Sequence, residues 1–153
     1  MTAETMLMRV GLGALRSAAA PVIDHRFFGP VRASGYDRDG WLWESLELLD
    51  TPRGRVDLSF TAGLSGPGPE HRSQLDAIIS RIGPLTRASA SMVLTELARH
   101  LGCPPDDRLE WRGAHLTDRE GEFGLEYSCG SWPASMIVVW FEQSRPVSVR
   151  LDD

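Results

Sequence analysis

The chain has 153 residues, 42% of them hydrophobic and 24% charged, which is typical of one globular domain and excludes wholesale disorder. Its formal net charge is -5, and its sixteen cationic side chains are spread along the sequence. We therefore predict no nucleic-acid partner, because phosphate binding requires clustered basic residues. All sixteen are arginine, and lysine and asparagine are absent, as in proteins encoded by GC-rich bacterial genomes.

Residues 1–26 are predicted to form an N-terminal arm or a short helix over residues 7–20, which Pro21 would end. The apolar run over residues 12–20 does not fit a signal peptide, because Glu4 precedes it and Arg16 interrupts it. No stretch reaches the roughly 20 apolar residues of a membrane span, so we predict no membrane partner. These features favour a cytoplasmic protein, and Cys103 and Cys129 are left open as a reduced pair or a single disulfide.

Strands are predicted over residues 27–62, at residues 28–33, 41–49 and 55–62. In the third, Val56, Leu58 and Phe60 alternate with polar residues, the period of a half-buried strand. Turn-rich segments at residues 34–40 and 50–54 separate the three strands. The pattern predicts a meander of antiparallel strands.

Two helices are predicted over residues 69–101. Apolar residues recur at helical spacing after Pro69, at Leu75, Ile78 and Ile82. Gly83 and Pro84 should end this first helix, and a second should run from residue 85 to residue 101. Gly102, with two prolines soon after it, is a strong signal for the end of a helix.

Strands are expected again over residues 109–151, at residues 109–116, 122–128, 136–141 and 147–151, with a hairpin turn at residues 117–121. The continuous apolar run of residues 136–141 is typical of a strand covered on both faces. We expect its cover to be the N-terminal segment or a second copy of the chain.

The order of these elements predicts an α+β fold over residues 27–153. Its antiparallel sheet or sheets would be formed by the strands before and after a central two-helix segment, and the helices would pack on one face.

The titratable residues show no motif for catalysis, a metal or a cofactor, so none of these is predicted. No histidine has a partner at metal-ligand spacing, and there is no nucleophile motif or phosphate-binding loop. His71 and His100, near helix ends, are interpreted as surface residues. His115, on a strand, is the histidine most open to a functional role.

Tryptophans and acidic turn residues are the candidates for binding a partner: Trp41, Trp43, Trp132, Asp37 and Asp39. Trp41 and Trp43 are two apart on one strand and should share a face. Tryptophan is enriched at binding hot spots, and an aromatic core is the alternative. Paired acids can bind a cation, whereas aspartate is also favoured in turns for its hydrogen bonds to the backbone.

Short motifs in both halves of the chain resemble a group of uncharacterised bacterial domains of unknown function. The motifs are Phe28-Gly29-Pro30-Val31, Tyr36-Asp37, Gly40-Trp41, Gly54 to Leu58 and Trp132 to Val139. The resemblance implies a Trp-bearing strand followed by two helices and a second sheet half. Where a Gly-His pair is expected, this chain has Ala134 and Ser135. Small proteins of this architecture are similar to immunity proteins of bacterial toxin systems.

The leading hypothesis is a non-enzymatic, cytoplasmic protein-binding domain of a bacterium, such as an immunity-type inhibitor whose acidic surface binds a basic toxin. The alternative is a small-molecule-binding or hydrolase-like enzyme whose site joins residues distant in sequence, for example His115 and a turn carboxylate. A homodimer that covers residues 136–141 is a third possibility.

Overall fold

Nine strands and one helix make up the described part of the chain. The computed structural model describes residues 20–102, 108–130 and 136–152. The strands before the helix are β1 (Val22–His25), β2 (Gly29–Asp37), β3 (Gly40–Ser45), β4 (Leu49–Thr51) and β5 (Gly54–Ala62). The helix, α2 (Pro69–Leu101), is followed by β6 (Glu110–Leu116), β7 (Phe123–Ser128), β8 (Met136–Glu142) and β9 (Arg145–Asp152). The helix predicted at residues 7–20 lies outside these ranges except for Ala20.

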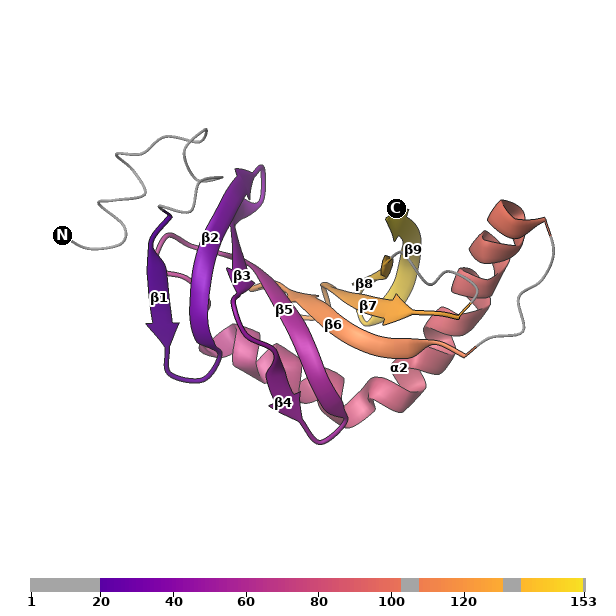
Figure 1. The fold of residues 1–153 in the computed structure, drawn as a ribbon, viewed down its shortest axis with the longest axis horizontal. Coiled ribbons are helices and arrows are strands. Elements are labelled where there is room, and N and C mark those ends of the chain that lie inside the picture. Colours follow the sequence, from indigo (N-terminus) through magenta and orange to yellow (C-terminus); the bar gives the residue numbers. More distant parts are fainter. Residues whose placement is uncertain (1–19, 103–107, 131–135, 153) are drawn as a thin grey trace.

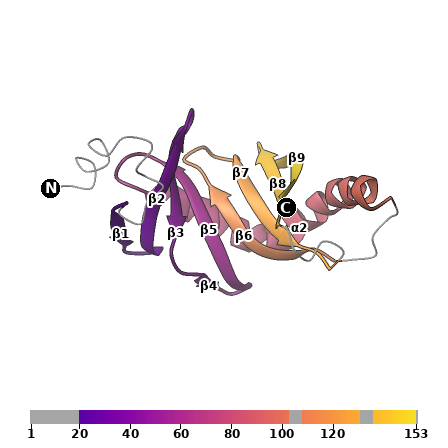
Figure 2. The same cartoon turned by 45° about the horizontal axis from the view of Figure 1, so that its top comes forward.

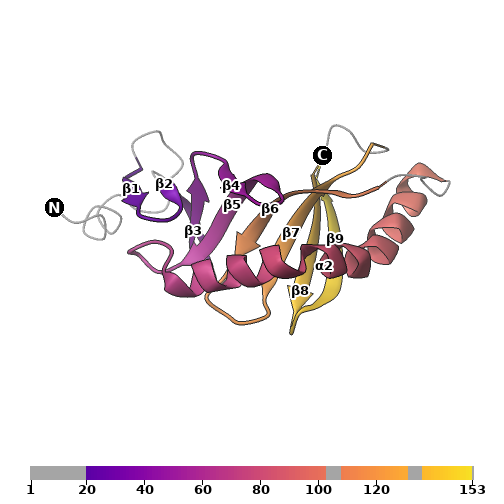
Figure 3. The ribbon, with the colours of Figure 1, turned by 90° about the horizontal axis from the view of Figure 1, so that it is seen from below.

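The strands form one sheet in the order β1-β2-β3-β5-β6-β7-β8-β9, with β4 paired to the start of β5 (Figures 1 and 2). The predicted meander is confirmed, since β2, β3 and β5 are antiparallel neighbours. The prediction of a purely antiparallel arrangement is wrong, because β5 and β6 pair in parallel. Parallel neighbours need a crossover connection, and α2 provides it across one face of the sheet (Figure 3).

The predicted central pair of helices is also wrong, because α2 is a single helix of 33 residues that contains Pro84. Proline removes one backbone hydrogen bond and bends a helix, and Figure 1 shows α2 changing direction near its middle. The helix continues because both halves have a buried apolar stripe, which includes Ile78 before the proline and Val93 after it. Gly102 ends the helix in the left-handed conformation, with φ of 71°, as its sequence signal indicated.

The hydrophobic core lies between α2 and the sheet face that it covers. Alternate residues of the central strands point into it, and Trp43, Phe60, Tyr127 and Phe141 are fully buried. Side chains of this size each stabilise the fold by roughly 1.5–3 kcal/mol when buried. The apolar alternation read in the sequence is therefore the pattern that builds the core.

His71 joins the start of α2 to the end of β5 and is only 1% exposed, so its prediction as a surface residue is wrong. The backbone N–H of Gly68 donates to Nδ1 at 3.0 Å, which leaves the ring proton on Nε2 to donate to the Thr61 carbonyl at 2.8 Å. The position at a helix start was readable in the sequence. The neighbouring strand that buries the ring was not.

Candidate functional site

Charged and polar side chains gather on the sheet face that is turned away from α2, which we call the open face. Side chains alternate along a strand, so the residues between core positions point to this face. Its central residues are Asp57, Ser59 and Thr61 of β5, His115 of β6, Glu126 of β7, Trp140 of β8, and Arg150 and Asp152 of β9. The strand register places them in rows across the sheet.

The first row places Ser59, His115, Gly124 and Trp140 directly opposite one another. The imidazole of His115 is held at both nitrogens: Nδ1 lies 2.8 Å from Ser59 Oγ, and Nε2 lies 2.8 Å from Thr61 Oγ1. In the neutral ring one nitrogen donates and the other accepts, so one hydroxyl donates to the ring and the other receives its proton. The network fixes the orientation of the ring.

Gly124 is required for this row because it leaves room beside the aromatic rings. A Cβ at this position would lie 3.2 Å from Trp140 Cε3 and 3.3 Å from the Cβ of His115. The centroids of the imidazole and the indole lie 5.9 Å apart. His115 and Trp140 therefore form one packed surface across β6, β7 and β8.

The second row places Asp57, Gly113 and Glu126 on three adjacent strands. A Cβ on Gly113 would lie 2.6 Å from Oε2 of Glu126, so the carboxyl group occupies the space that the glycine leaves. Burial and the charge of Asp57 raise the pKa of Glu126 from 4.5 to about 7, with a further contribution from Asp152 and an opposing one from Arg150.

The raised pKa brings the protonated and the ionised forms of the Glu126 carboxyl closer in energy at neutral pH, and this has two chemical consequences. The group can exchange a proton with a bound molecule. It can also become ionised when a cation approaches, because an opposite charge favours the carboxylate. Within the described ranges, no group of three or more His, Cys, Asp or Glu residues is placed to hold a metal ion.

Two of the partner-binding residues predicted from sequence, Trp41 and Trp43, lie away from this face. Trp41 and Trp43 share a face as predicted, but that face is the core, where Trp43 is fully buried and its Nε1 donates to the Gly63 carbonyl at 3.1 Å. Trp41 is partly exposed and packs against Tyr36, with ring centroids 5.3 Å apart.

The acidic turn between β2 and β3 holds another of these residues. Asp39 is exposed, and its carboxylate lies 3.5 Å from Nε of Arg38. The side chain of Asp37 and the whole of Trp132 lie outside the described residues. Trp41 and Asp39 therefore remain near one end of the β2–β3 hairpin, and the structure does not bring them together with the open face.

Sequence reasoning selected His115 but missed Glu126, Asp57, Ser59 and Thr61. The available signal was the alternation of Asp57, Ser59 and Thr61 with buried residues on β5. A polar residue at every second position is ordinary for a half-exposed strand, so the signal does not single out a site. What makes the site is the parallel register of β5 and β6, which joins residues more than 50 positions apart.

No protein-family model matches the chain, and neither a curated protein nor a solved structure matches it. The resemblance to uncharacterised bacterial domains stays a prediction.

Proposed function

We propose that the chain is a non-enzymatic protein-binding domain whose open face receives a basic segment of a protein partner. The observation that carries this proposal is the Glu126 carboxyl, whose pKa is raised to about 7 by burial and by Asp57. Burial and the negative charge of Asp57 disfavour the ionised form of Glu126, and carboxyl groups with a raised pKa concentrate at functional sites. A cationic side chain from a partner would stabilise the carboxylate form that the protein alone disfavours.

The arginines of the open face compensate this acidic pair only in part, because Arg150 lowers the pKa of Glu126 but does not cancel its rise. Arg32 Nη2 lies 2.6 Å from Glu44 Oε1, and Arg150 Nε lies 2.7 Å from Asp152 Oδ1. Each arginine therefore has an acidic partner of its own. When Glu126 is ionised, it and Asp57 of β5 together give the centre of the face a net negative charge.

Trp140 supplies the apolar part of the proposed contact. Its indole is half-buried beside the imidazole of His115, and Met136 and Val138 are also partly exposed on the same side of β8. A partly exposed tryptophan near a carboxylate suits a lysine or arginine, which gains a cation–π contact and an ion pair together. Tryptophan is also among the residues enriched at binding hot spots.

More specifically, we propose that the chain is a cytoplasmic immunity protein of a bacterium, which inhibits a basic toxin by binding to it. The formal charge of -5 supports electrostatic attraction to such a partner. No helix in the described part of the chain is long and apolar enough to cross a membrane. Nucleic acid and membranes are not proposed as partners.

Site-specific photo-cross-linking in the native host tests the proposal. A photoreactive amino acid replaces Val138 on the open face, and a matched control replaces Arg87 on the exposed side of α2. We expect the first position to capture a protein with a basic surface segment and the second to leave that protein uncaptured. The captured protein then serves as the probe for calorimetry.

In calorimetry, Glu126→Gln and Trp140→Ala should each weaken binding by roughly tenfold or more, because each removes a charged or aromatic contact worth about 1.4 kcal/mol or more. Since a cation favours the carboxylate, binding should release a proton from Glu126, and the affinity should fall as the pH decreases below 7. Unchanged affinity in both variants would contradict the proposal.

A homodimer through the open face is the competing arrangement. Light scattering distinguishes it, because the open face of a dimer would be covered by a second copy. A concentration-independent monomer mass is the result that our proposal predicts.

A hydrolase-like enzyme is the second candidate, favoured by the 2.8 Å contact between Ser59 Oγ and His115 Nδ1. A histidine that accepts the proton of a serine can activate it as a nucleophile. A fluorophosphonate probe tests this role directly. Labelling that Ser59→Ala abolishes would favour the enzyme over the binding domain.

A further inference from the structure

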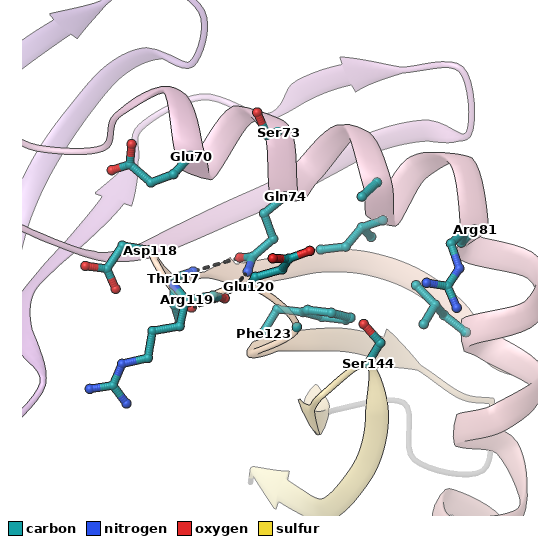
Figure 4. A pocket seen from close by; sticks show the side chains of 14 residues that line it. Glu70, Ser73, Gln74, Arg81, Thr117, Asp118, Arg119, Glu120, Phe123 and Ser144 are labelled. Carbon is teal, nitrogen blue, oxygen red and sulfur yellow. Dashed lines mark hydrogen bonds between the residues drawn. The ribbon is translucent and has the colours of Figure 1, made fainter.

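A pocket lies on the helix side of the molecule, between the first half of α2 and the turn that joins β6 to β7 (Figure 4). Its volume is about 450 Å³, and Ser144 of the β8–β9 turn closes one side. Pockets for small molecules have volumes of about 300–1,000 Å³. The hollow therefore has the size of a site for a small ligand, and it is separate from the open face.

The walls of this pocket are held in place by Gln74 of α2. Its Oε1 accepts a hydrogen bond from the Thr117 N–H at 2.8 Å, and its Nε2 donates to the carbonyls of Arg119 and Glu122 at 2.9 and 3.0 Å. The backbone N–H of Ser144 donates to the Gly121 carbonyl at 3.1 Å. Because these bonds hold the turn against α2, a ligand would not have to order it, which lowers the entropic cost of binding.

The floor of the pocket is apolar and rigid. Ile78, Leu85 and Phe123 line it, and each is at most 4% exposed. The Phe123 ring stacks on Phe141 with centroids 4.8 Å apart, so it cannot turn aside easily. An apolar group that lies on this floor would be removed from water.

Five charged residues line the pocket: Glu70, Arg81, Asp118, Arg119 and Glu120. Figure 4 shows Glu120 of the β6–β7 turn close to Phe123, and Arg81 of α2 farther along the helix, to the right in this view. Neither side chain makes an ion pair or hydrogen bond with another residue in the described part of the chain. By contrast, Arg119 on the same turn is paired with Glu122 at 3.4 Å. Arg81 and Glu120 are therefore available to a ligand.

We propose that this pocket binds a small zwitterion with an apolar body, of which a short apolar peptide is the simplest example. The ligand carboxylate would accept two hydrogen bonds from the Arg81 guanidinium, and its ammonium group would donate to Glu120. The apolar body between them would lie on Phe123 and Ile78. A simple anion fits less well because Glu120 repels it, and a simple cation is repelled by Arg81.

The probe for this site is the dipeptide leucyl-phenylalanine, titrated into the full chain and followed by ¹H–¹⁵N NMR. We expect saturable shifts of the backbone signals of Gln74, Gly121 and Ser144. The N-acetylated dipeptide lacks the ammonium charge, and the dipeptide amide lacks the carboxylate. Each should bind at least about tenfold more weakly, since a charge-assisted hydrogen bond is worth about 1.5–3 kcal/mol.

Charge-neutralising variants assign the two contacts. Arg81→Gln should remove the preference for the dipeptide over its amide, and Glu120→Gln should remove the preference over the acetylated form. Arg87→Gln, on the same helix outside the pocket, and Glu47→Gln, on a distant turn, are the matched controls and should bind as the unaltered chain does.

Absence of shifts at millimolar dipeptide would overturn the proposal. Equal binding of the dipeptide and its two derivatives would overturn it too. Glu126→Gln should leave dipeptide binding unchanged, because that residue lies on the other side of the sheet. The outcome of this experiment is therefore independent of the function proposed for the open face.

Discussion

The two faces of the sheet are built from the same strands, but they differ in the side chains that cover them. On the helix side, apolar side chains such as Trp43 and Phe60 are fully buried. On the open face, the alternate residues of the same strands carry hydroxyl, imidazole and carboxyl groups, among them Ser59 and Glu126. Natural proteins tolerate destabilising groups where function requires them. The comparison indicates that the helix side supplies most of the stability, whereas the open face holds the polar groups on which the proposed function rests.

The largest expected difference between the faces comes from removing one tryptophan on each. Trp43→Ala should destabilise the fold by about 3–5 kcal/mol, because it leaves a cavity in the core. Trp140→Ala removes a half-buried ring and should lower the free energy of unfolding by about 1 kcal/mol. Urea unfolding measures both. Similar losses in the two variants would contradict the division between the faces.

Gly113→Ala should produce the next largest effect. The added Cβ would lie 2.5 Å from the Asp57 carbonyl oxygen, a backbone atom that cannot move freely. We expect destabilisation of about 1–3 kcal/mol from overpacking. Gly124→Ala is the matched control, because its nearest contact is 3.2 Å, to the Trp140 side chain, and it should cost less. The reverse order in urea unfolding would show that the register of β5, β6 and β7 is wrong.

Glu126→Gln should stabilise the fold, but only where the carboxyl would be ionised. The pKa of Glu126 is raised in the folded state from 4.5 to about 7, so the folded protein holds the proton more tightly than the unfolded chain. The contribution of protonated Glu126 to the free energy of unfolding is fully present below pH 4.5, and it is lost as the pH rises through 7. At pH 8.5 the neutral glutamine should therefore add about 1–3 kcal/mol, and at pH 4 the two proteins should be equally stable. Equal stability at both pH values would contradict this interpretation.

The smallest effect should come from Tyr127→Phe on the helix side. The buried phenol contacts Thr86 Oγ1 at 3.2 Å and Ser89 Oγ at 3.4 Å. Its removal should cost about 1 kcal/mol, the usual net value of a buried hydrogen bond. Thermal unfolding measures this loss, and Ser128→Ala, on the exposed side of the same strand, is a control that should change stability less.

The sequence predicted the strands well because alternation of apolar and polar residues is a local signal. Strands were expected at residues 55–62 and 136–141, and they occur at Gly54–Ala62 and Met136–Glu142. The strand at Val22–His25 lies within the segment predicted as an arm or helix, because four residues show little periodicity. Local patterns therefore predict the longer strands but not the shortest ones.

Features that depend on distant residues could not be predicted in the same way. Pro84 carries a strong local signal for a helix end, but packing against the sheet on both sides of it keeps α2 continuous. His115 was a candidate, yet its partners on β5 follow from a parallel register that no local pattern encodes. The raised pKa of Glu126 likewise depends on Asp57, which is 69 positions away in the sequence but two strands away in the sheet.

The pKa of the Glu126 carboxyl, measured by ¹³C NMR over a pH titration, tests the account of the open face most directly. We expect a pKa of about 7 in the unaltered chain. In Asp57→Asn the pKa should fall but stay above 4.5, because burial, the larger cause, remains. A pKa near 4.5 in the unaltered chain would contradict the account, as would a pKa that Asp57→Asn does not change. Either result would show that burial and Asp57 do not disfavour the carboxylate form, which a bound cation is expected to stabilise.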